Sequence, residues 1–397
     1  MNKKTAIVMG SNYSTTLGVI RSLGEGGYDV SIYAVTAKHN AIRTAALSKY
    51  VKQTIQHHDH NDQAIVEELI SHFSGEEKPV ILPADDYTAV LLGRNQDLLR
   101  KHFYIPYVDH EKYSVEYLMD KSHQYEIAEQ FGLKTAKCYT LRYVDGGYEI
   151  PDDLLFPCFL KPLLSIKGGK NGMLRVDTRE ELQEQLGIFL RNDLKADVLL
   201  QQYLDIKEEY SMSGICMGDT VIIPALLTKI QVAKRKPGVT IFGRVDRLDR
   251  IGDVKDRLLA MMGSLNYYGL FDMELFRCSD GYYFNEINFR SSSVCYIVTE
   301  AGMNLPVAIA DFLRSGEKPA EHEIAFGKYF ISEKPAYEDY VIGCMSRSKL
   351  ARYLKKADYF MMHNDKDSLP EKFYFYKRTR FAVSWNIRQL IKRVRTR

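Results

Sequence analysis

The sequence predicts an α/β domain built on a parallel sheet, followed by an α+β region and a basic C-terminal segment. Two patterns support this prediction: residues 5–35 read as strand–loop–helix–strand, and residues 271–290 read as two alternating strands that carry acidic, amide and guanidinium side chains. The chain has 397 residues, more than the roughly 250–300 residues that one hydrophobic core supports. We therefore expect domains over residues 1–112, 113–320 and 321–397.

The composition is that of a globular protein, with 45% hydrophobic and 26% charged residues. The net charge of +3 is too small to indicate nucleic-acid binding by the whole chain. Six scattered cysteines without a CxxC pair favour a reduced cytoplasmic protein over a disulfide framework or a zinc site. The first apolar run is too short for a signal peptide, and no segment approaches the roughly 20 apolar residues of a transmembrane helix.

The first unit implies a parallel sheet with a ligand-facing loop. Its elements are a strand over 5–10, a polar loop over 11–16, a helix over 17–25 and a strand over 28–35. Ligands of such units bind beyond the carboxyl ends of the strands. The loop lacks GxGxxG, which argues against a dinucleotide. After a later strand over 79–82, Asp85 is either the cap of the next helix or a substrate-binding group.

The next region carries lysines and a glycine-rich segment. A helix over 114–132 has Lys121 in its middle, and an apolar strand over 156–161 ends in Lys161. Residues 165–172, SIKGGKNG, are not a Walker loop, because no GK[ST] follows the glycines. Backbone N–H groups of such a segment suit a flap that closes over phosphate, and a plain hairpin turn is the alternative.

The two strands over 271–290 meet at the sequence Ser279-Asp280-Gly281. Their polar side chains recur at the period of two that keeps residues on one face of a strand: Asp272, Glu274, Glu286, Asn288 and Arg290. A two-residue turn would place Glu274 and Glu286 on opposite faces, whereas a three-residue loop ending in glycine sets them opposite each other. We predict the three-residue loop, which also sets Asp272 opposite Asn288. The resulting oxygen-rich patch suits a hard cation such as Mg²⁺, and a solvated strand is the alternative.

Glu274 followed by Glu286-Ile287-Asn288-Phe289-Arg290 resembles the metal-binding end of the ATP-grasp superfamily, whose members use Glu…Glu-x-Asn to hold magnesium on ATP. Gln202 and Glu209 have the seven-residue spacing of the nucleotide hinge in that superfamily, with glutamine in place of the commoner glutamate. The resemblance covers about residues 113–316. The preceding domain is similar in type to the one before the ATP-grasp core of biotin carboxylase and carbamoyl phosphate synthetase.

The resemblance implies a Rossmann-like N-terminal domain, a two-lobed ATP-grasp core and a basic extension. It implies an enzyme of the carboxylate–amine ligase type, related to D-aspartate ligase-like enzymes, which activates a carboxylate as an acylphosphate and joins it to an amine with release of ADP and phosphate. The implied ATP-binding residues are Lys121, Lys161, Ser165, Gly168, Gly169, Gln202, Tyr203, Leu204 and Glu209. The implied ligands of two Mg²⁺ ions are Glu274, Glu286 and Asn288. The implied catalytic residues are Arg290 and Lys161.

Two other functions remain open at this stage: a bicarbonate-activating enzyme of the carbamoyl phosphate synthetase or carboxylase type, and a non-catalytic ATP-binding scaffold. The expected partners are a small-molecule carboxylate and amine, with a homodimer left open and no nucleic acid expected. Between the hinge and the metal strands lies a run of cations that either faces water or contacts phosphate or substrate: Lys229, Lys234, Arg235, Lys236 and Arg244.

The C-terminal tail has a composition of its own. Residues 372–397 contain nine Lys or Arg and no acidic residue. Apolar residues fall at helical spacing on one side and Arg388, Lys392 and Arg395 on another. The tail either packs on the core of the protein or docks on an anionic membrane surface, which would make a cytoplasmic protein peripheral at the inner face of the membrane.

Overall fold

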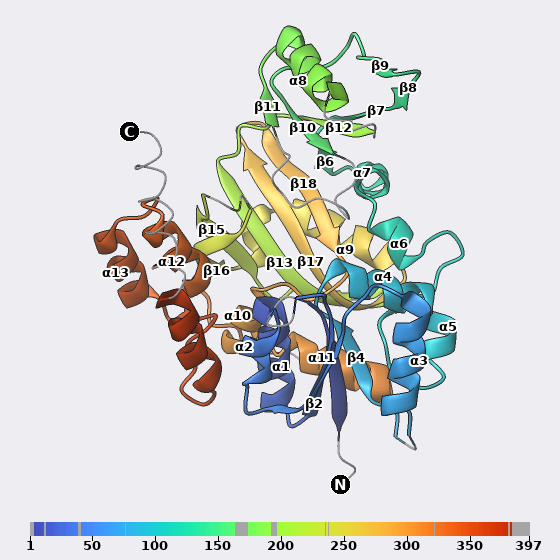
Figure 1. Ribbon diagram of the computed structural model, residues 1–397, viewed down its shortest axis with the longest axis vertical. Coiled ribbons are helices and arrows are strands. Elements are labelled where there is room, and N and C mark those ends of the chain that lie inside the picture. The colour runs from blue at the N-terminus through green and yellow to red at the C-terminus, as the bar shows by residue number, and fades with distance from the viewer. Residues whose placement is uncertain are drawn as a thin grey trace.

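The computed structural model describes residues 4–11, 13–38, 41–75, 77–162, 174–191, 197–234, 236, 238–320, 322–379 and 382. These residues form two four-stranded sheets, one ten-stranded sheet and a two-stranded ribbon. Figure 1 shows the N-terminal unit at one end, the long strands of the largest sheet in the middle and a smaller sheet at the other end. The C-terminal helices lie to the side of the largest sheet.

The N-terminal unit is a parallel sheet flanked by helices, as the sequence predicts. Its strand order is β3-β2-β1-β4, and each strand is parallel to its neighbours. The strands are β1 (Thr5–Met9), β2 (Asp29–Val35), β3 (Val51–His57) and β4 (Val80–Pro83). The helices are α1 (Tyr13–Glu25), α2 (Arg43–Ala46), α3 (Asp62–Phe73), α4 (Asp86–Arg94) and α5 (Gln96–Leu99). Among the strands, only β3 was not anticipated, because this edge strand is largely polar and none of its residues is fully buried. The short helix α2 was not anticipated either.

The largest sheet forms the centre of the molecule, with the strand order β20-β19-β16-β15-β13-β17-β18-β6. Its strands are β6 (Lys134–Thr135), β13 (Glu208–Met217), β15 (Leu226–Val232), β16 (Thr240–Asp246), β17 (Tyr267–Cys278), β18 (Gly281–Asn288), β19 (Tyr329–Ile331) and β20 (Tyr359–Phe360). Two short strands join it from outside this order: β5 (Tyr107–Val108) pairs with β17, and β14 (Thr220–Ile222) pairs with β13. The helices of this part are η1 (Leu248–Ile251), α9 (Val254–Ser264), α10 (Cys295–Glu300) and α11 (Leu305–Ser315).

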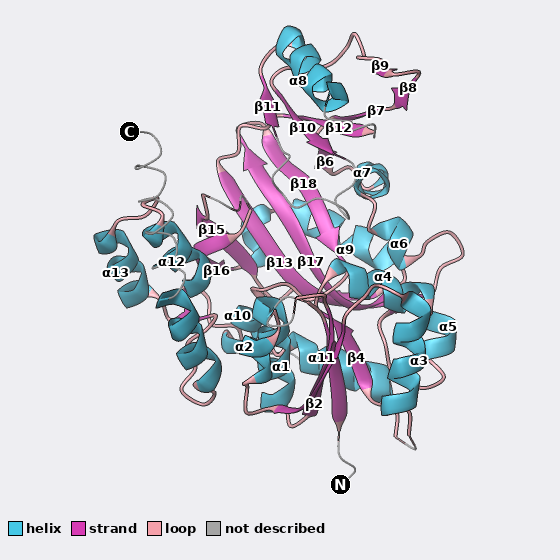
Figure 2. Ribbon diagram, viewed as in Figure 1, coloured by secondary structure: helices cyan, strands magenta, loops and turns pink. Residues whose placement is uncertain are grey.

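The smaller sheet has the order β11-β10-β12-β7 and is covered by α8 (Arg179–Arg191). Its strands are β7 (Cys138–Leu141), β10 (Cys158–Pro162), β11 (Leu174–Val176) and β12 (Val198–Gln202). The ribbon of β8 (Tyr143–Val144) and β9 (Gly147–Tyr148) lies beside it. Residues 203–207 link β12 of this sheet to β13 of the largest sheet, and Figure 2 shows both sets of strands in magenta.

Two predicted helices differ from the structure. The helix expected over 17–25 begins earlier, because α1 starts at Tyr13 inside the predicted polar loop. The expected helix over 114–132 is divided into α6 (Val115–Leu118) and α7 (Lys121–Gln130). The break occurs because Asp120 leaves the helical conformation and caps α7, its carboxylate accepting a hydrogen bond of 2.8 Å from the Ser122 amide. Lys121 is therefore the first residue of a helix instead of a residue in the middle of one.

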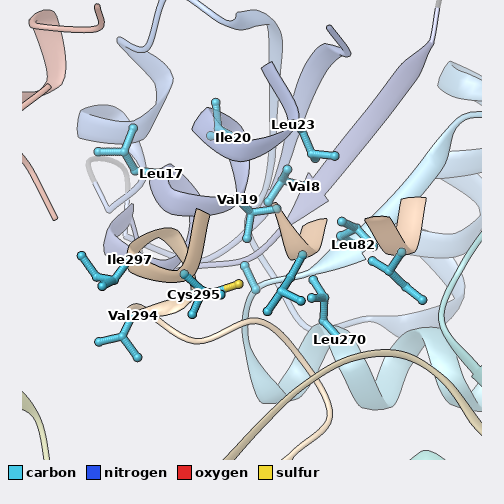
Figure 3. Packing of buried hydrophobic residues seen from close by; sticks show 14 of the residues in the cluster. Val8, Leu17, Val19, Ile20, Leu23, Leu82, Leu270, Val294, Cys295 and Ile297 are labelled. Carbon is cyan, nitrogen blue, oxygen red and sulfur yellow. The ribbon is translucent and has the colours of Figure 1, made fainter. Parts of the chain in front are cut away.

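The N-terminal unit and the largest sheet share a continuous apolar core. Figure 3 shows Val8 and Leu23 of the N-terminal unit packed with Leu270 of β17 and with Cys295 and Ile297 of α10. All five side chains are at least 98% buried. The same core extends to the C-terminal region through Phe330 and Tyr374. Apolar burial on this scale fixes the N-terminal unit against the sheet.

The C-terminal region is built on α12 (Glu333–Val341), α13 (Arg347–Lys356) and a further helical segment over 369–379. It also supplies β19 and β20 to the largest sheet. Arg21 of α1 and Asp367 form an ion pair of 3.0 Å across the contact with the N-terminal unit. In the part of the chain that the structure describes, no helix combines the length and the apolarity needed to cross a bilayer. Most of the predicted basic tail lies outside the described residues.

Candidate active site

Four neighbouring strands of the largest sheet turn polar side chains to one face. Across β13 and β17, Ser211 pairs with Glu274 and Ser213 with Asp272, and across β13 and β15, Glu209 pairs with Lys229. Residues paired across two strands lie on the same face. On the opposite face the alternating residues of these strands are buried and apolar: Tyr210, Met212, Met273, Leu275 and Ile287. The period-two alternation therefore places the candidate site on one side and the core on the other.

The predicted pairing of the two carboxylate strands is present, but for a different reason from the one predicted. Glu274 pairs with Glu286 and Asp272 with Asn288. The turn itself has two residues, because Cys278 pairs with Gly281. A register shift after Glu274 inserts Asn285 as an extra residue in β18 and restores the alignment. The prediction of a three-residue loop is thus wrong, and the β-bulge at Asn285 is what sets Glu274 opposite Glu286.

A buried ammonium group joins two of the carboxylates. Lys229 Nζ lies 2.7 Å from Glu274 Oε1 and 3.8 Å from Glu209 Oε2, and its side chain is only 2% exposed. Burial alone would lower the pKa of Lys229, but the charges of Glu274 and Glu209 outweigh it and the pKa is raised. Burial raises the pKa of Glu209, and the Lys229 charge opposes that shift. Lys229 is therefore a charged group held at the centre of the polar face.

The bulge residue Asn285 connects a helix N-terminus to this group. Lys121 Nζ donates to Asn285 Oδ1 at 3.0 Å and lies 3.8 Å from Glu286 Oε2. The Asn285 amide in turn donates to Glu274 Oε2 at 3.1 Å. Sequence reasoning missed Asn285, because the alternation that singled out Glu286 excludes the residue next to it. Only the bulge brings both to the same side.

The contacts continue from β18 into the N-terminal unit. Asn288 Nδ2 lies 3.4 Å from Glu286 Oε1, and Arg290 Nη2 donates to Asn288 Oδ1 at 3.2 Å. Arg290 Nη1 donates to the Ser291 carbonyl at 3.1 Å, and Arg290 Nε donates to Asp86 Oδ1. Asp86 belongs to α4, so the N-terminal unit reaches the candidate site directly.

Asp272 lies beneath the polar face. Its carboxylate accepts hydrogen bonds from Ser213 Oγ at 2.8 Å and Ser211 Oγ at 3.1 Å. Burial, with a further contribution from the Glu274 charge, raises the pKa of Asp272 to about 6. Hydrogen bonds from the Ser292 and Ser213 hydroxyls and the Arg290 charge oppose this shift without cancelling it.

The predicted nucleotide hinge lies where the two sheets join. Gln202 ends β12, and its side-chain oxygen accepts from the Lys137 amide at 3.3 Å. The Tyr203 amide donates to the Pro157 carbonyl at 3.0 Å, and the Tyr203 ring has the Arg175 guanidinium 4.4 Å from its centre. Leu204 follows on the linker, and Glu209 begins the polar face beyond it. The spacing predicted from the sequence thus spans the junction of the two sheets.

The remaining predicted residues are distributed as follows. Lys161 lies on β10, paired with Leu199, whereas Ser165, Gly168 and Gly169 lie outside the described residues. Among the cations of the predicted run, Lys236 pairs with Glu338 at 3.4 Å and Arg244 with Asp246 at 2.7 Å. Of the members of that run that are described, Lys229 is the one bound to the metal-strand carboxylates.

Asp85 is a helix cap, one of its two predicted roles. One carboxylate oxygen accepts from the Thr88 amide of α4 at 2.9 Å. The other accepts from the amide and the hydroxyl of Ser11, in the loop after β1, at 2.6 and 2.8 Å. These bonds join the polar loop of the first unit to the start of α4.

The donor set fits a hard cation. Glu286 and Asn288 present carboxylate and amide oxygens next to Glu274, and Mg²⁺ accepts such ligands while taking others from water and phosphate. Across the described residues, no three His, Cys, Asp or Glu side chains are grouped as a self-sufficient metal site. The predicted set has only two carboxylates and therefore suits a cation whose coordination is completed by a bound phosphate.

No family model matches the chain. Its fold is similar to that of L-amino acid ligase from Bacillus licheniformis, with a TM-score of 0.60 and 14% identity, covering 83% of this chain and 79% of that one. It is similar to N5-carboxyaminoimidazole synthetase from Staphylococcus aureus complexed with ADP, with a TM-score of 0.61 and 18% identity, covering 82% and 80%.

A third similar structure is the biotin carboxylase domain of Hydrogenobacter thermophilus 2-oxoglutarate carboxylase, in complex with MgADP, ADP and bicarbonate. Its TM-score is 0.60 at 18% identity, covering 81% of this chain and 73% of that one. At such identities the likeness establishes the fold. The predicted architecture, an N-terminal parallel-sheet domain followed by a core of two further sheets, is confirmed.

Proposed function

We propose that the chain is an ATP-dependent ligase that joins a carboxylate to an amine and releases ADP and phosphate. One observation carries this proposal: Glu274, Glu286 and Asn288 share one sheet face, and Arg290 directly after β18 contacts Asn288. Glu274 lies on β17, which pairs with β13, the strand that follows the linker between the two sheets. The similar structures support it, since they include an L-amino acid ligase and complexes with ADP and MgADP.

ATP would bind between the two sheets. The adenine would meet the backbone of Tyr203 and Leu204, while Gln202 and Glu209 at the two ends of the linker would bind the ribose. Lys121, at the start of α7, and Lys161, on β10, would approach the phosphates from the largest and the smaller sheet. The helix N-terminus adds partial positive charge at Lys121.

Two Mg²⁺ ions would be held by Glu274, Glu286 and Asn288. Bound there, Mg²⁺ would neutralise charge on the phosphate oxygens of ATP. Phosphoryl transfer demands positioning and charge neutralisation more than acid–base chemistry. Lys229 fixes Glu274 through the contact of 2.7 Å, and Asn285 fixes its second oxygen. The protein therefore presents the ligand oxygens in a preset arrangement.

Arg290 would receive the carboxylate substrate. Transfer of the γ-phosphoryl group to that carboxylate forms an acylphosphate and ADP. Attack by the amine forms the amide and expels phosphate, with one proton released from the amine. A planar guanidinium suits both the carboxylate and the acylphosphate, because each presents a pair of oxygens to its fork.

The function is tested by measuring ADP release with each of the twenty amino acids as the carboxylate and hydroxylamine as the amine. Hydroxylamine traps an acylphosphate as a hydroxamate, so the assay does not require the natural amine. We expect magnesium-dependent ADP release and hydroxamate formation with a subset of acids. Glu286→Gln should reduce turnover by at least about 100-fold while leaving the folded state intact.

Glu208→Gln is the matched control, because Glu208 lies on the opposite face of β13 from Glu209 and forms ion pairs with Arg250 and Arg277. Its turnover should equal that of the unchanged protein. ADP release with bicarbonate alone, and with none of the acids, would instead favour a bicarbonate-activating enzyme. Binding of MgATP without any acid-dependent turnover, across an extended acid panel, would favour a non-catalytic scaffold.

A further inference from the structure

We propose that Asp86 is a positioning residue that holds the Arg290 guanidinium in the orientation in which it receives the carboxylate. The inference rests on the proposed function for the identity of the ligand that Arg290 binds. It adds a residue of the N-terminal unit to the site, one that neither the carboxylate pattern nor the hinge spacing indicated.

The contacts of Arg290 use only some of its N–H donors. A guanidinium has five N–H groups. The Nε donor goes to Asp86 Oδ1, one Nη2 donor goes to Asn288 Oδ1 at 3.2 Å, and one Nη1 donor goes to the Ser291 carbonyl at 3.1 Å. The described contacts therefore use one donor on each nitrogen and leave one donor on each of the two terminal nitrogens.

Those two remaining donors are available to the oxygens of a carboxylate. Asp86 takes the Nε donor, which is not one of them. Rotation of the guanidinium about its Cδ–Nε bond would redirect both terminal nitrogens. Asp86, Asn288 and the Ser291 carbonyl together oppose that rotation, and Asp86 is the charged member of the three.

The position of Asp86 is fixed by the start of α4. It is the first residue of α4, and the preceding residue, Asp85, caps that helix and binds Ser11. With the cap supplied by Asp85, the Asp86 carboxylate is available to Arg290. A carboxylate in the first turn of a helix is also stabilised by the partial positive charge there. The backbone of Asp86 is thus anchored by its neighbour, and its carboxylate reaches out of the N-terminal unit.

The ion pair of Asp86 and Arg290 should contribute little to folding stability. The Asp86 side chain is 58% exposed and the Arg290 side chain 19% exposed. Ion pairs with an exposed partner contribute little to folding stability because solvent screens them. A substrate bound by Arg290 would still depend on the geometry of the guanidinium, since displacement by about 1 Å is enough to impair catalysis. Loss of Asp86 should therefore change the reaction much more than the stability.

The experiment compares Asp86→Asn with Asp62→Asn, using the acid that gives the fastest hydroxamate formation. Asp62 is the matched control, because it accepts a hydrogen bond of 2.6 Å from Tyr87 and pairs with Arg94 in the same unit. We expect Asp86→Asn to lower kcat/KM for the acid by about 10-fold, with KM for ATP and the midpoint of thermal unfolding unchanged. Asp86→Glu, which keeps the charge, should recover part of the loss, and Asp62→Asn should match the unchanged protein.

A second measurement does not depend on turnover. The ¹⁵N–¹H resonance of Arg290 Nε, identified by its disappearance in Arg290→Lys, should shift in Asp86→Asn and stay in place in Asp62→Asn. Unchanged kcat/KM for the acid in Asp86→Asn, or an unchanged resonance, overturns the assignment of Asp86. If the unchanged protein turns over none of the acids but the resonance shifts, the positioning contact stands and the ligase function fails.

Discussion

Two arginine–aspartate pairs join the N-terminal unit to the rest of the molecule, and they differ in how completely they are satisfied. Arg21 and Asp367 are 0% and 1% exposed. Arg21 Nε donates to Asp367, and its terminal nitrogens donate to the carbonyls of Met361, Met362 and Asp367. Arg290 and Asp86 lie at the surface of the polar face, where Arg290 retains donors on both terminal nitrogens.

The difference shows what each pair does. A buried charge is tolerated only when it is paired and hydrogen-bonded on all sides. Asp367 meets this condition, since it also accepts from Ser48 Oγ at 2.8 Å and from the Lys49 amide at 2.9 Å. Because both side chains are buried, this pair is inaccessible to a ligand and fixes the C-terminal region on the N-terminal unit. In the Asp86 pair, the described contacts of Arg290 leave donors on both terminal nitrogens, as the proposed binding of a carboxylate requires.

The largest expected effect on stability comes from breaking the buried pair of Arg21 and Asp367. Asp367→Ala leaves the Arg21 guanidinium buried without a counter-charge and should lower the free energy of unfolding by about 3–5 kcal/mol. Denaturant unfolding measures this, with Asp365→Ala as control because the Asp365 side chain is 96% exposed. A loss of less than about 1 kcal/mol would mean that the buried pair of Arg21 and Asp367 does not govern the stability of the contact between the N-terminal unit and the C-terminal region.

Asp272 sharpens the comparison, because it is buried like Asp367 yet bonded by hydroxyl groups instead of a cation. Its pKa is raised from 3.8 to about 6. The folded protein therefore binds a proton more tightly than the unfolded chain does, and the contribution of Asp272 to stability falls as the pH rises from about 4 to about 6. Above pH 6 the full penalty for the buried charge remains.

Asp272→Asn keeps an acceptor for both serine hydroxyls and removes that charge. We expect the variant to be more stable than the unchanged protein at pH 8, by up to about 3 kcal/mol, with the difference vanishing near pH 4. Thermal unfolding across this pH range measures it, and Asp97→Asn on the exposed side of α5 serves as control. An equal difference at both pH values would show that something other than the Asp272 charge causes it.

The hairpin shows how far sequence reasoning reached. The alternation of Glu274, Glu286 and Asn288 gave the correct face and the correct pairing, because one face of the sheet is buried and register is then strongly specified. The mechanism was wrong, because a two-residue turn and a bulge at Asn285 give the same alignment as a three-residue loop. A bulge has no pattern of its own in a single sequence, so Asn285 was missed with it.

The contacts between distant segments could not be predicted, because local sequence patterns do not show which distant residues meet. The N-terminal parallel sheet followed from local patterns within about thirty residues. The Arg21–Asp367 and Arg290–Asp86 pairs join residues 346 and 204 positions apart. Nothing in the local sequence marks Arg21 as buried, since arginine is mostly found at the surface. Asp86 directly follows Asp85, for which the sequence predicted a role. Two neighbouring aspartates do not by themselves indicate which one caps the helix and which one contacts Arg290.

The smallest expected effect concerns the tail, which extends the comparison to the end of the chain. The helical segment over 369–379 belongs to the junction, because Tyr374 is buried in the shared core and the Phe373 ring lies 5.0 Å from the Arg43 guanidinium. A chain stopped after Glu371 loses these contacts and should be less stable by about 2 kcal/mol. A chain stopped after Thr379 keeps them and should unfold as the full chain does.

Vesicle binding separates the two predicted roles of the tail. Six of the nine cations of the tail lie in residues 380–397, and the longer truncation keeps the other three, Lys372, Lys377 and Arg378. Each cation near an anionic surface contributes about 1 kcal/mol. If the tail docks on membranes, the full chain should sediment with phosphatidylserine vesicles and not with phosphatidylcholine vesicles, and the chain stopped after Thr379 should sediment with neither. Equal sedimentation of both chains with both lipids would contradict membrane docking.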